Sequence, residues 1–136
     1  MLKQVSLFTE NKEGGLFKIT NVLAGYQINI YTMLANDSAE YGIIRLIVDK
    51  PDEAIKVLRE AGYQCREDKV IAIIMEDTPG CLDNILSAIH GANIDISYLY
   101  ISFERETGKP VVVFKTNEPE TATFLMGKGY NLIENF

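Results

Sequence analysis

The chain has 136 residues, of which 47% are apolar and 24% charged, and its net charge is −6. This composition is typical of a soluble globular protein that can build a real hydrophobic core. The acidic balance, with no run of Lys or Arg, argues against nucleic acid and anionic membranes as partners.

The first half of the chain predicts six elements in the order strand, helix, strand, strand, helix, strand. Residues 4–9 alternate as a strand, and an apolar stripe then marks a helix. Strands are expected at 28–34 and 43–48, with turn residues at 36–38 between them. Pro51 opens a second helix that Gly62 ends, and residues 63–66 form a short fourth strand. The helical stripes consist of Leu16, Ile19, Leu23 and Tyr26, then of Ala54, Leu58 and Ala61.

The second half predicts the same order again. Residues 70–75 form a strand, and Leu82, Ile85 and Ile89 form the stripe of a helix. A hairpin joins strands at 94–103 and 111–115 through the turn at 106–109. Pro119 opens the last helix, and residues 130–133 form a final short strand.

The two halves also match residue by residue, which is the signature of an internal repeat. Gly80 lies 66 positions after Gly14, and at this offset Ile85 follows Ile19 and Ile89 follows Leu23. The offset is 68 between Pro51 and Pro119 and 67 between Gly62 and Gly129, as surface hairpins of unequal length would cause. The boundary falls near Glu67 and Asp68, so we expect two domains, 1–67 and 68–136, that pack tightly because each is very small.

The repeated order is that of an α+β, ferredoxin-like βαββαβ unit, an antiparallel sheet with helices on one face. Many functions use this fold, so the motif must decide. The pattern of Pro79, Gly80, Leu82, Ile85 and Ile89, followed by residues 94–96, resembles the ACT domain, the amino-acid-binding regulatory module of metabolic enzymes. The first half shows the same pattern with Glu13 in place of the proline. The resemblance covers nearly the whole chain and implies a stand-alone tandem ACT protein with no catalytic domain.

The resemblance implies a ligand site in the loop between the first strand and first helix of each half, near a domain interface. The residues support a free amino acid independently. Backbone N–H groups at a helix N-terminus suit a carboxylate, and glycines let a ligand approach the backbone. Asn29 and Asp95 each stand between two isoleucines and could accept hydrogen bonds from the ammonium. The candidate ligand-binding residues are Asn11, Lys12, Glu13, Gly14, Gly15, Leu16, Asn29, Ile30, Asp77, Thr78, Pro79, Gly80, Cys81, Leu82, Asp95 and Ile96.

Simpler interpretations of these residues stay open. Glycine before a helix is often only a turn requirement, and the polar residues of both loops could be solvated. Asn29 and Asp95 could cap a strand or face water. The absent proline in the first half means that one site could be degenerate. Beside these, Cys81 could be a small packed side chain or a reactive thiol, His90 is expected to be structural or solvated, and Tyr98 and Tyr100 line the sheet or an interface.

Three classes of function compete. The favoured one is a cytoplasmic amino-acid sensor that regulates a metabolic enzyme and acts as a homodimer. The alternative is an interaction or dimerisation module that binds no ligand and regulates a partner enzyme. An enzyme ranks third, because a single histidine and no nucleophile motif offer no catalytic set. No metal or cofactor is expected, since Cys65 and Cys81 match no metal spacing, and no segment resembles a signal peptide.

Overall fold

The computed structural model describes residues 1–10, 14–35 and 41–136. They form two compact units. The first unit comprises residues 3–68, and the second unit comprises residues 69–136 together with Met1 and Leu2.

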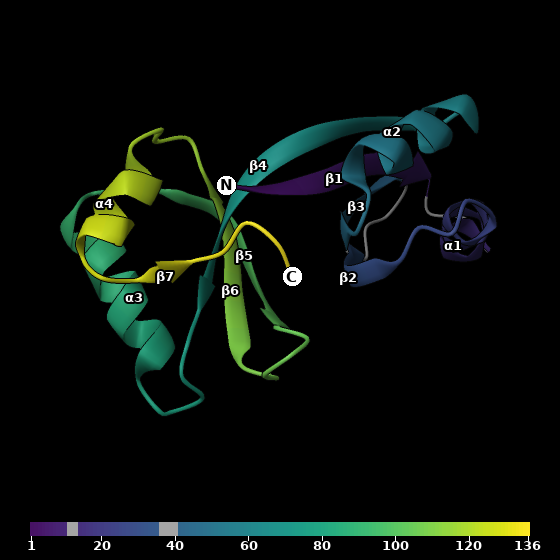
Figure 1. The fold of residues 1–136 in the computed structure, drawn as a ribbon. Helices are drawn as coiled ribbons and strands as arrows, with labels where there is room; N and C mark the ends of the chain where they lie inside the picture. Colours follow the sequence, from purple (N-terminus) through teal and green to yellow (C-terminus); the bar gives the residue numbers. More distant parts are fainter. Residues whose placement is uncertain (11–13, 36–40) are drawn as a thin grey trace. The chain divides into compact units, whose positions relative to one another are not determined.

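The first unit has two helices and the strands of one antiparallel sheet (Figure 1). Its elements are β1 (Leu2–Glu10), α1 (Gly15–Gly25), β2 (Ile30–Ala35), β3 (Tyr41–Val48), α2 (Pro51–Glu60) and the first part of β4 (Gln64–Ile74). β3 pairs antiparallel with both β1 and β2, and the strand order is β2-β3-β1-β4.

The second unit repeats this arrangement with the remainder of β4 as its first strand. It continues with α3 (Cys81–Gly91), β5 (Ile96–Phe103), β6 (Pro110–Thr116), α4 (Thr121–Gly127) and β7 (Asn131–Leu132). β4 pairs antiparallel with β6 and β7, and β6 pairs with β5. Figure 1 shows α3 and α4 together on one side of these strands. The predicted βαββαβ repeat with helices on one face is therefore confirmed.

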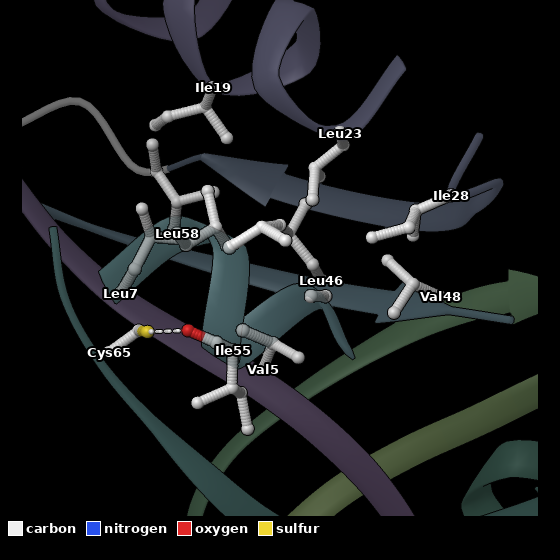
Figure 2. Packing of buried hydrophobic residues seen from close by; sticks show 13 residues of the cluster. Val5, Leu7, Ile19, Leu23, Ile28, Leu46, Val48, Ile55, Leu58 and Cys65 are labelled. Carbon is white, nitrogen blue, oxygen red and sulfur yellow. Dashed lines mark hydrogen bonds between the residues drawn. The ribbon is translucent and has the colours of Figure 1, made fainter. Parts of the chain in front are cut away.

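The core of the first unit forms where alternate strand residues meet the middle of the helices (Figure 2). Val5 and Leu7 of β1 pack with Ile19 and Leu23 of α1, and all four are fully buried. The thiol of Cys65 lies in the same cluster and donates to the carbonyl oxygen of Ile55 over 3.5 Å. Burial raises the pKa of this thiol, so Cys65 stays neutral and belongs to the core.

The predicted helical stripes are too long at their ends. Ile19 and Leu23 are buried as expected, but Leu16 and Tyr26 are 45% and 50% exposed. Ala61 is exposed as well, at the C-cap of α2. In α1 the buried residues lie in the central turns, so Leu16 in the first turn and Tyr26 at the C-cap stay exposed although they are apolar.

The largest difference from the predicted elements is β4. We expected a short strand at 63–66 and a separate strand at 70–75, but one continuous strand runs from Gln64 to Ile74. The acidic pair Glu67 and Asp68 has low strand propensity and reads as a break. The segment nevertheless contains no glycine or proline, so nothing in the backbone stops the strand. The last predicted helix also begins later, at Thr121, two residues after Pro119.

Two strands begin two residues later than predicted because the preceding helices end in a Schellman motif. After α1, Gln27 has a φ of 57°, and the N–H of Ile28 donates to the carbonyl oxygen of Leu23 over 3.0 Å. After α3, Asn93 has a φ of 55°, and the N–H of Ile94 donates to the carbonyl oxygen of Ile89 over 3.2 Å. Ile28 and Ile94 therefore belong to the C-terminal motifs of the helices. The strands β2 and β5 start two residues later, at Ile30 and Ile96.

Candidate ligand-binding loops

The loop from β4 to α3 turns on Gly80, the residue immediately before the helix. Gly80 has a φ of +86°, in the left-handed region that side chains with a Cβ rarely adopt. No heavy atom lies within 4 Å of the position that a Cβ would occupy there. The glycine is therefore required by the turn, and the space in front of it is open.

Hydrogen bonds within this loop fix its shape and leave part of the helix N-terminus open. The N–H of Thr78 donates to the carbonyl oxygen of Glu76 over 2.9 Å, and that of Cys81 donates to Thr78 over 3.3 Å. Intrahelical bonding begins with the N–H of Asn84, which donates to the carbonyl oxygen of Gly80 over 2.9 Å. Within the described residues, the N–H groups of Leu82 and Asp83 have no acceptor. They are the donors that a helix start leaves for a cap, water or an anion.

The first unit has the same geometry at its corresponding loop. Gly14 precedes α1 with a φ of +76°. Here too, no heavy atom lies within 4 Å of the position that a Cβ would occupy. The carbonyl oxygen of Gly14 accepts the N–H of Lys18 over 3.0 Å. Three of the predicted site residues, Asn11, Lys12 and Glu13, lie outside the described residues.

The side chains that flank the two glycines differ in exposure. Asp77, Thr78 and Pro79 are exposed, as is Leu16 in the first turn of α1. Cys81 and Leu82 are half-buried and pack against the core of the second unit. These two residues fix the start of α3 to the core, whereas the residues before Gly80 face solvent.

Asn29 and Asp95 do not lie beside the loops of their own units. Ile30, next to Asn29, pairs with Val48 at one end of β3, whereas Glu10, the last residue before the first loop, pairs with Tyr41 at the other end. At ~3.4 Å per residue, the ends of β3 are roughly 24 Å apart. The same holds in the second unit, where Ile96 pairs with Thr116 and Ile74 with Val111. No single unit therefore brings a predicted ammonium acceptor to its own glycine loop.

Both acceptor candidates are exposed, while the isoleucines before them are covered. The backbone of Asn29 is bonded to Asp49: the N–H of Asn29 donates to Asp49 Oδ1 over 2.9 Å, and the N–H of Asp49 donates to the Asn29 carbonyl oxygen over 3.1 Å. This pair closes the end of the hairpin. These bonds use only the backbone of Asn29, so its side-chain amide, like the carboxylate of Asp95, stays exposed.

One contact at the second loop was not anticipated from the sequence. Lys109 Nζ lies 2.8 Å from Glu76 Oε1, and the N–H of Met75 donates to the carbonyl oxygen of Pro110 over 2.8 Å. The tip of the β5–β6 hairpin is thereby fixed to the start of the glycine loop. Pairing of residues 33 positions apart has no local pattern, so only the strand register could have shown it.

The remaining residues singled out in the sequence, His90, Tyr98 and Tyr100, lie outside the glycine loops. His90 is exposed near the end of α3, Tyr98 is half-buried, and Tyr100 is buried on β5. Across residues 1–10, 14–35 and 41–136, no group of three metal-binding side chains comes together. Within the same residues, no helix is both long and apolar enough to cross a membrane.

Comparison with solved structures finds the same fold in other proteins. Protein BT0572 from Bacteroides thetaiotaomicron is 30% identical, with a TM-score of 0.88 over 97% of this chain and 91% of that one. The ligand-free regulatory subunit of aspartate kinase from Thermus thermophilus is 14% identical, with a TM-score of 0.67 over 93% and 90% of the two chains. The corresponding subunit from Thermus flavus gives 14% identity and a TM-score of 0.60, over 91% and 88%.

Sequence comparison supplies the family. No curated protein matches the chain. A family model described as an ACT domain pair matches residues 1–135, and ACT domains are regulatory ligand-binding modules. The match spans both units and includes both glycine loops, which agrees with the repeat and with the fold. The chain therefore belongs to the family of ACT domain pairs.

Proposed function

We propose that this protein is a sensor that binds a free L-amino acid at its glycine loops and regulates a metabolic enzyme in response. The observation that carries the proposal is the geometry at Gly14 and Gly80. Each glycine combines a left-handed φ with open space in front of a helix N-terminus. A ligand carboxylate there would accept hydrogen bonds from the open N–H groups and face the positive end of the helix dipole.

The ammonium of the ligand needs an oxygen acceptor, and the loop of the second unit carries one candidate itself. Asp77 is an exposed carboxylate three residues before Gly80. Asn29 and Asp95 stay in the proposal as acceptors contributed by the second chain of a homodimer, because neither reaches the loop of its own unit. One of these residues, Asp77, Asn29 or Asp95, would accept hydrogen bonds from the ammonium. Substituting that residue by Leu would leave the ammonium unpaired and weaken ligand binding.

The two loops are not expected to bind equally well. The first turn of α3 contains Asp83, whereas the first turn of α1 contains no acidic residue. A carboxylate near the helix N-terminus already interacts with the dipole and repels a second anion. We therefore expect the loop at Gly14 to hold a ligand carboxylate more tightly than the loop at Gly80.

The test is a screen of the full chain against the proteinogenic amino acids at millimolar concentration, with thermal unfolding as the first readout and calorimetry as confirmation. A ligand at 100 times its dissociation constant adds about 2.7 kcal/mol of stability. For any hit, the amide of the same amino acid removes the carboxylate and the N-acetyl form removes the ammonium. Both should bind far more weakly. If no amino acid shifts the transition, or if the amide binds as well as the acid, the proposal is wrong.

A cytoplasmic location is part of the proposal. Cys65 and Cys81 are both free, and free thiols suit a reducing compartment.

A second function, association through the sheet edges, is favoured by a separate observation. β2 and β5 are edge strands, and neither contains a charged residue or a proline. Natural edge strands usually carry such residues because they prevent pairing with other chains. Ile101 and Phe103 of β5 are also strongly exposed. We therefore propose a homodimer in which an edge strand pairs with its copy.

Light scattering should accordingly show about twice the 15.3 kDa mass of one chain. Ile101→Lys places a charge on the edge of β5 and should raise the dimer dissociation constant by at least tenfold if β5 pairs with its copy. Met126→Lys is the matched control, since it introduces the same charge at an exposed apolar residue on α4. A chain that stays monomeric at all concentrations contradicts the homodimer.

A further inference from the structure

An open groove lies between α1 and α2 on the helical face of the first unit. It has a volume of about 330 Å³ and is lined by the last two turns of both helices. Val22 and Val57 provide apolar lining, and Val57 is buried. The groove is at the C-terminal end of α1, whereas Gly14 is at the N-terminal end, so the two places are distinct.

Three polar or aromatic side chains border this groove: Asn21, Tyr26 and Glu60. Tyr26 is 50% exposed, and Glu60 and Asn21 are exposed as well. Within the described residues, no hydrogen bond or ion pair is made by the side chain of any of the three. An aromatic ring beside a carboxylate and an amide oxygen is the environment that a guanidinium or ammonium group prefers.

One large apolar side chain of α1 lies exposed near the groove. Phe17 is 70% exposed, more than any other large apolar residue whose exposure the structure describes. It precedes Asn21 by four residues and Gly25 by eight, so the three lie along one stripe of the helix. An open groove leaves most of a small ligand in water, whereas small-molecule sites enclose their ligands. The combination of an open groove that suits a cation and a neighbouring apolar residue favours a segment of a protein as the ligand.

We propose that this α1–α2 face, defined by Phe17, Asn21, Gly25, Tyr26 and Glu60, docks a partner protein through an arginine or lysine side chain. The basic group binds between Tyr26 and Glu60, and an apolar residue of the partner covers Phe17. Two turns of α1 separate Phe17 from Gly25, about 12 Å, so the two partner residues stand about two helical turns apart. The proposal does not depend on amino-acid binding, because it uses none of the loop residues.

The second repeat of the chain offers an internal comparison. At the offset of 66 residues, Phe17 corresponds to Asp83 and Tyr26 to Ala92. At the offset of 67 that relates Gly62 to Gly129, Glu60 corresponds to Gly127, next to the exposed Lys128. The same fold is thus built with no aromatic ring at the Phe17 and Tyr26 positions and with an uncharged glycine at the Glu60 position. The fold does not require the groove residues, and a basic partner would be directed to the first unit.

The experiment is an NMR titration of the full chain with an alanine-based helical peptide that carries Leu and Arg seven positions apart. Amide signals of Gly25, Tyr26 and Ala61 should shift and saturate, while those of Gly91 and Ala92 should not. A second peptide replaces Arg with citrulline, which keeps the shape and removes the charge. It should bind at least fivefold more weakly, since the cation–π and carboxylate interactions are lost.

Variants of the chain complete the test. Tyr26→Ala and Glu60→Gln should each weaken the arginine peptide by about fivefold. Glu53→Gln, which removes another exposed carboxylate of α2 outside the groove, should leave binding within about twofold. The proposal is overturned if the arginine peptide gives no shifts at the groove, if citrulline binds equally well, or if Glu53→Gln weakens binding as much as Glu60→Gln.

Discussion

Phe114→Ala should lower the free energy of unfolding by about 3–5 kcal/mol, the usual cost of removing a large buried side chain. Phe114 is the largest fully buried side chain among the described residues and belongs to the second-unit core. It pairs with Ile71 on β4 and with Leu99 on β5, and it packs in one cluster with residues of α3 and α4, so the cavity would open between the sheet and these helices. Total stabilities of 5–15 kcal/mol are usual, so much of the fold's stability depends on this ring.

The same variant tests whether the two units unfold together. β4 gives residues 64–68 to the first unit and residues 69–74 to the second, without a break in the strand. We expect loss of the second-unit core to release this strand and to lower one common transition in urea. Phe17→Ala is the matched control, because the same ring is removed from a position on α1 that is 70% exposed and outside the proposed dimer edges, and it should cost less than about 1 kcal/mol. A curve with two steps, one at the wild-type midpoint, would show instead that the units unfold independently.

Most of the fold could be predicted because both repeats show the same periodicity in register. Alternation identified the strands, and the spacing of Ile19 and Leu23, repeated at Ile85 and Ile89, identified the helices that cover them. The predicted elements were wrong where the secondary-structure propensity of a short segment disagrees with the structure around it. Glu67 and Asp68 suggested a break in a strand that the sheet continues, and Leu16 and Tyr26 suggested burial where the helix extends past the sheet.

The candidate site was predicted less completely. The glycines before each helix were identified from the motif, but their left-handed φ angles could not be read from the sequence. Asn29 and Asp95 share a position in the repeat, which suggested a common role with the loops. Their distance from those loops follows from strand register, which places the start of β2 and the end of β1 at opposite ends of β3. Periodicity indicates on which face of the sheet a residue lies. It does not indicate at which end of the sheet the residue lies.

Gly80 is a residue at which a single substitution should affect ligand binding directly, and the sign of its φ decides how the experiment must be designed. At +86°, valine is strained whatever the space around it, so Gly80→Val should lose about 1–2 kcal/mol of stability. A loss of affinity in this variant would therefore mix two causes. Asparagine tolerates the left-handed region, so Gly80→Asn should fold with little loss while placing a side chain in the open space.

Gly80→Asn should weaken amino-acid binding at its loop by roughly 5- to 150-fold, the equivalent of 1–3 kcal/mol for polar ligand atoms left unpaired. Gly14→Asn should do the same at the first loop, which we expect to be the tighter of the two. Gly129→Asn is the matched control: it makes the same substitution at a φ of +91°, at the end of α4 and outside both loops, and should leave affinity unchanged. Stability and affinity are measured on each variant by thermal unfolding and calorimetry. If Gly14→Asn and Gly80→Asn both fold and both retain full affinity, the ligand is held elsewhere, because the proposal places the ligand carboxylate in the open space that the new side chains would enter.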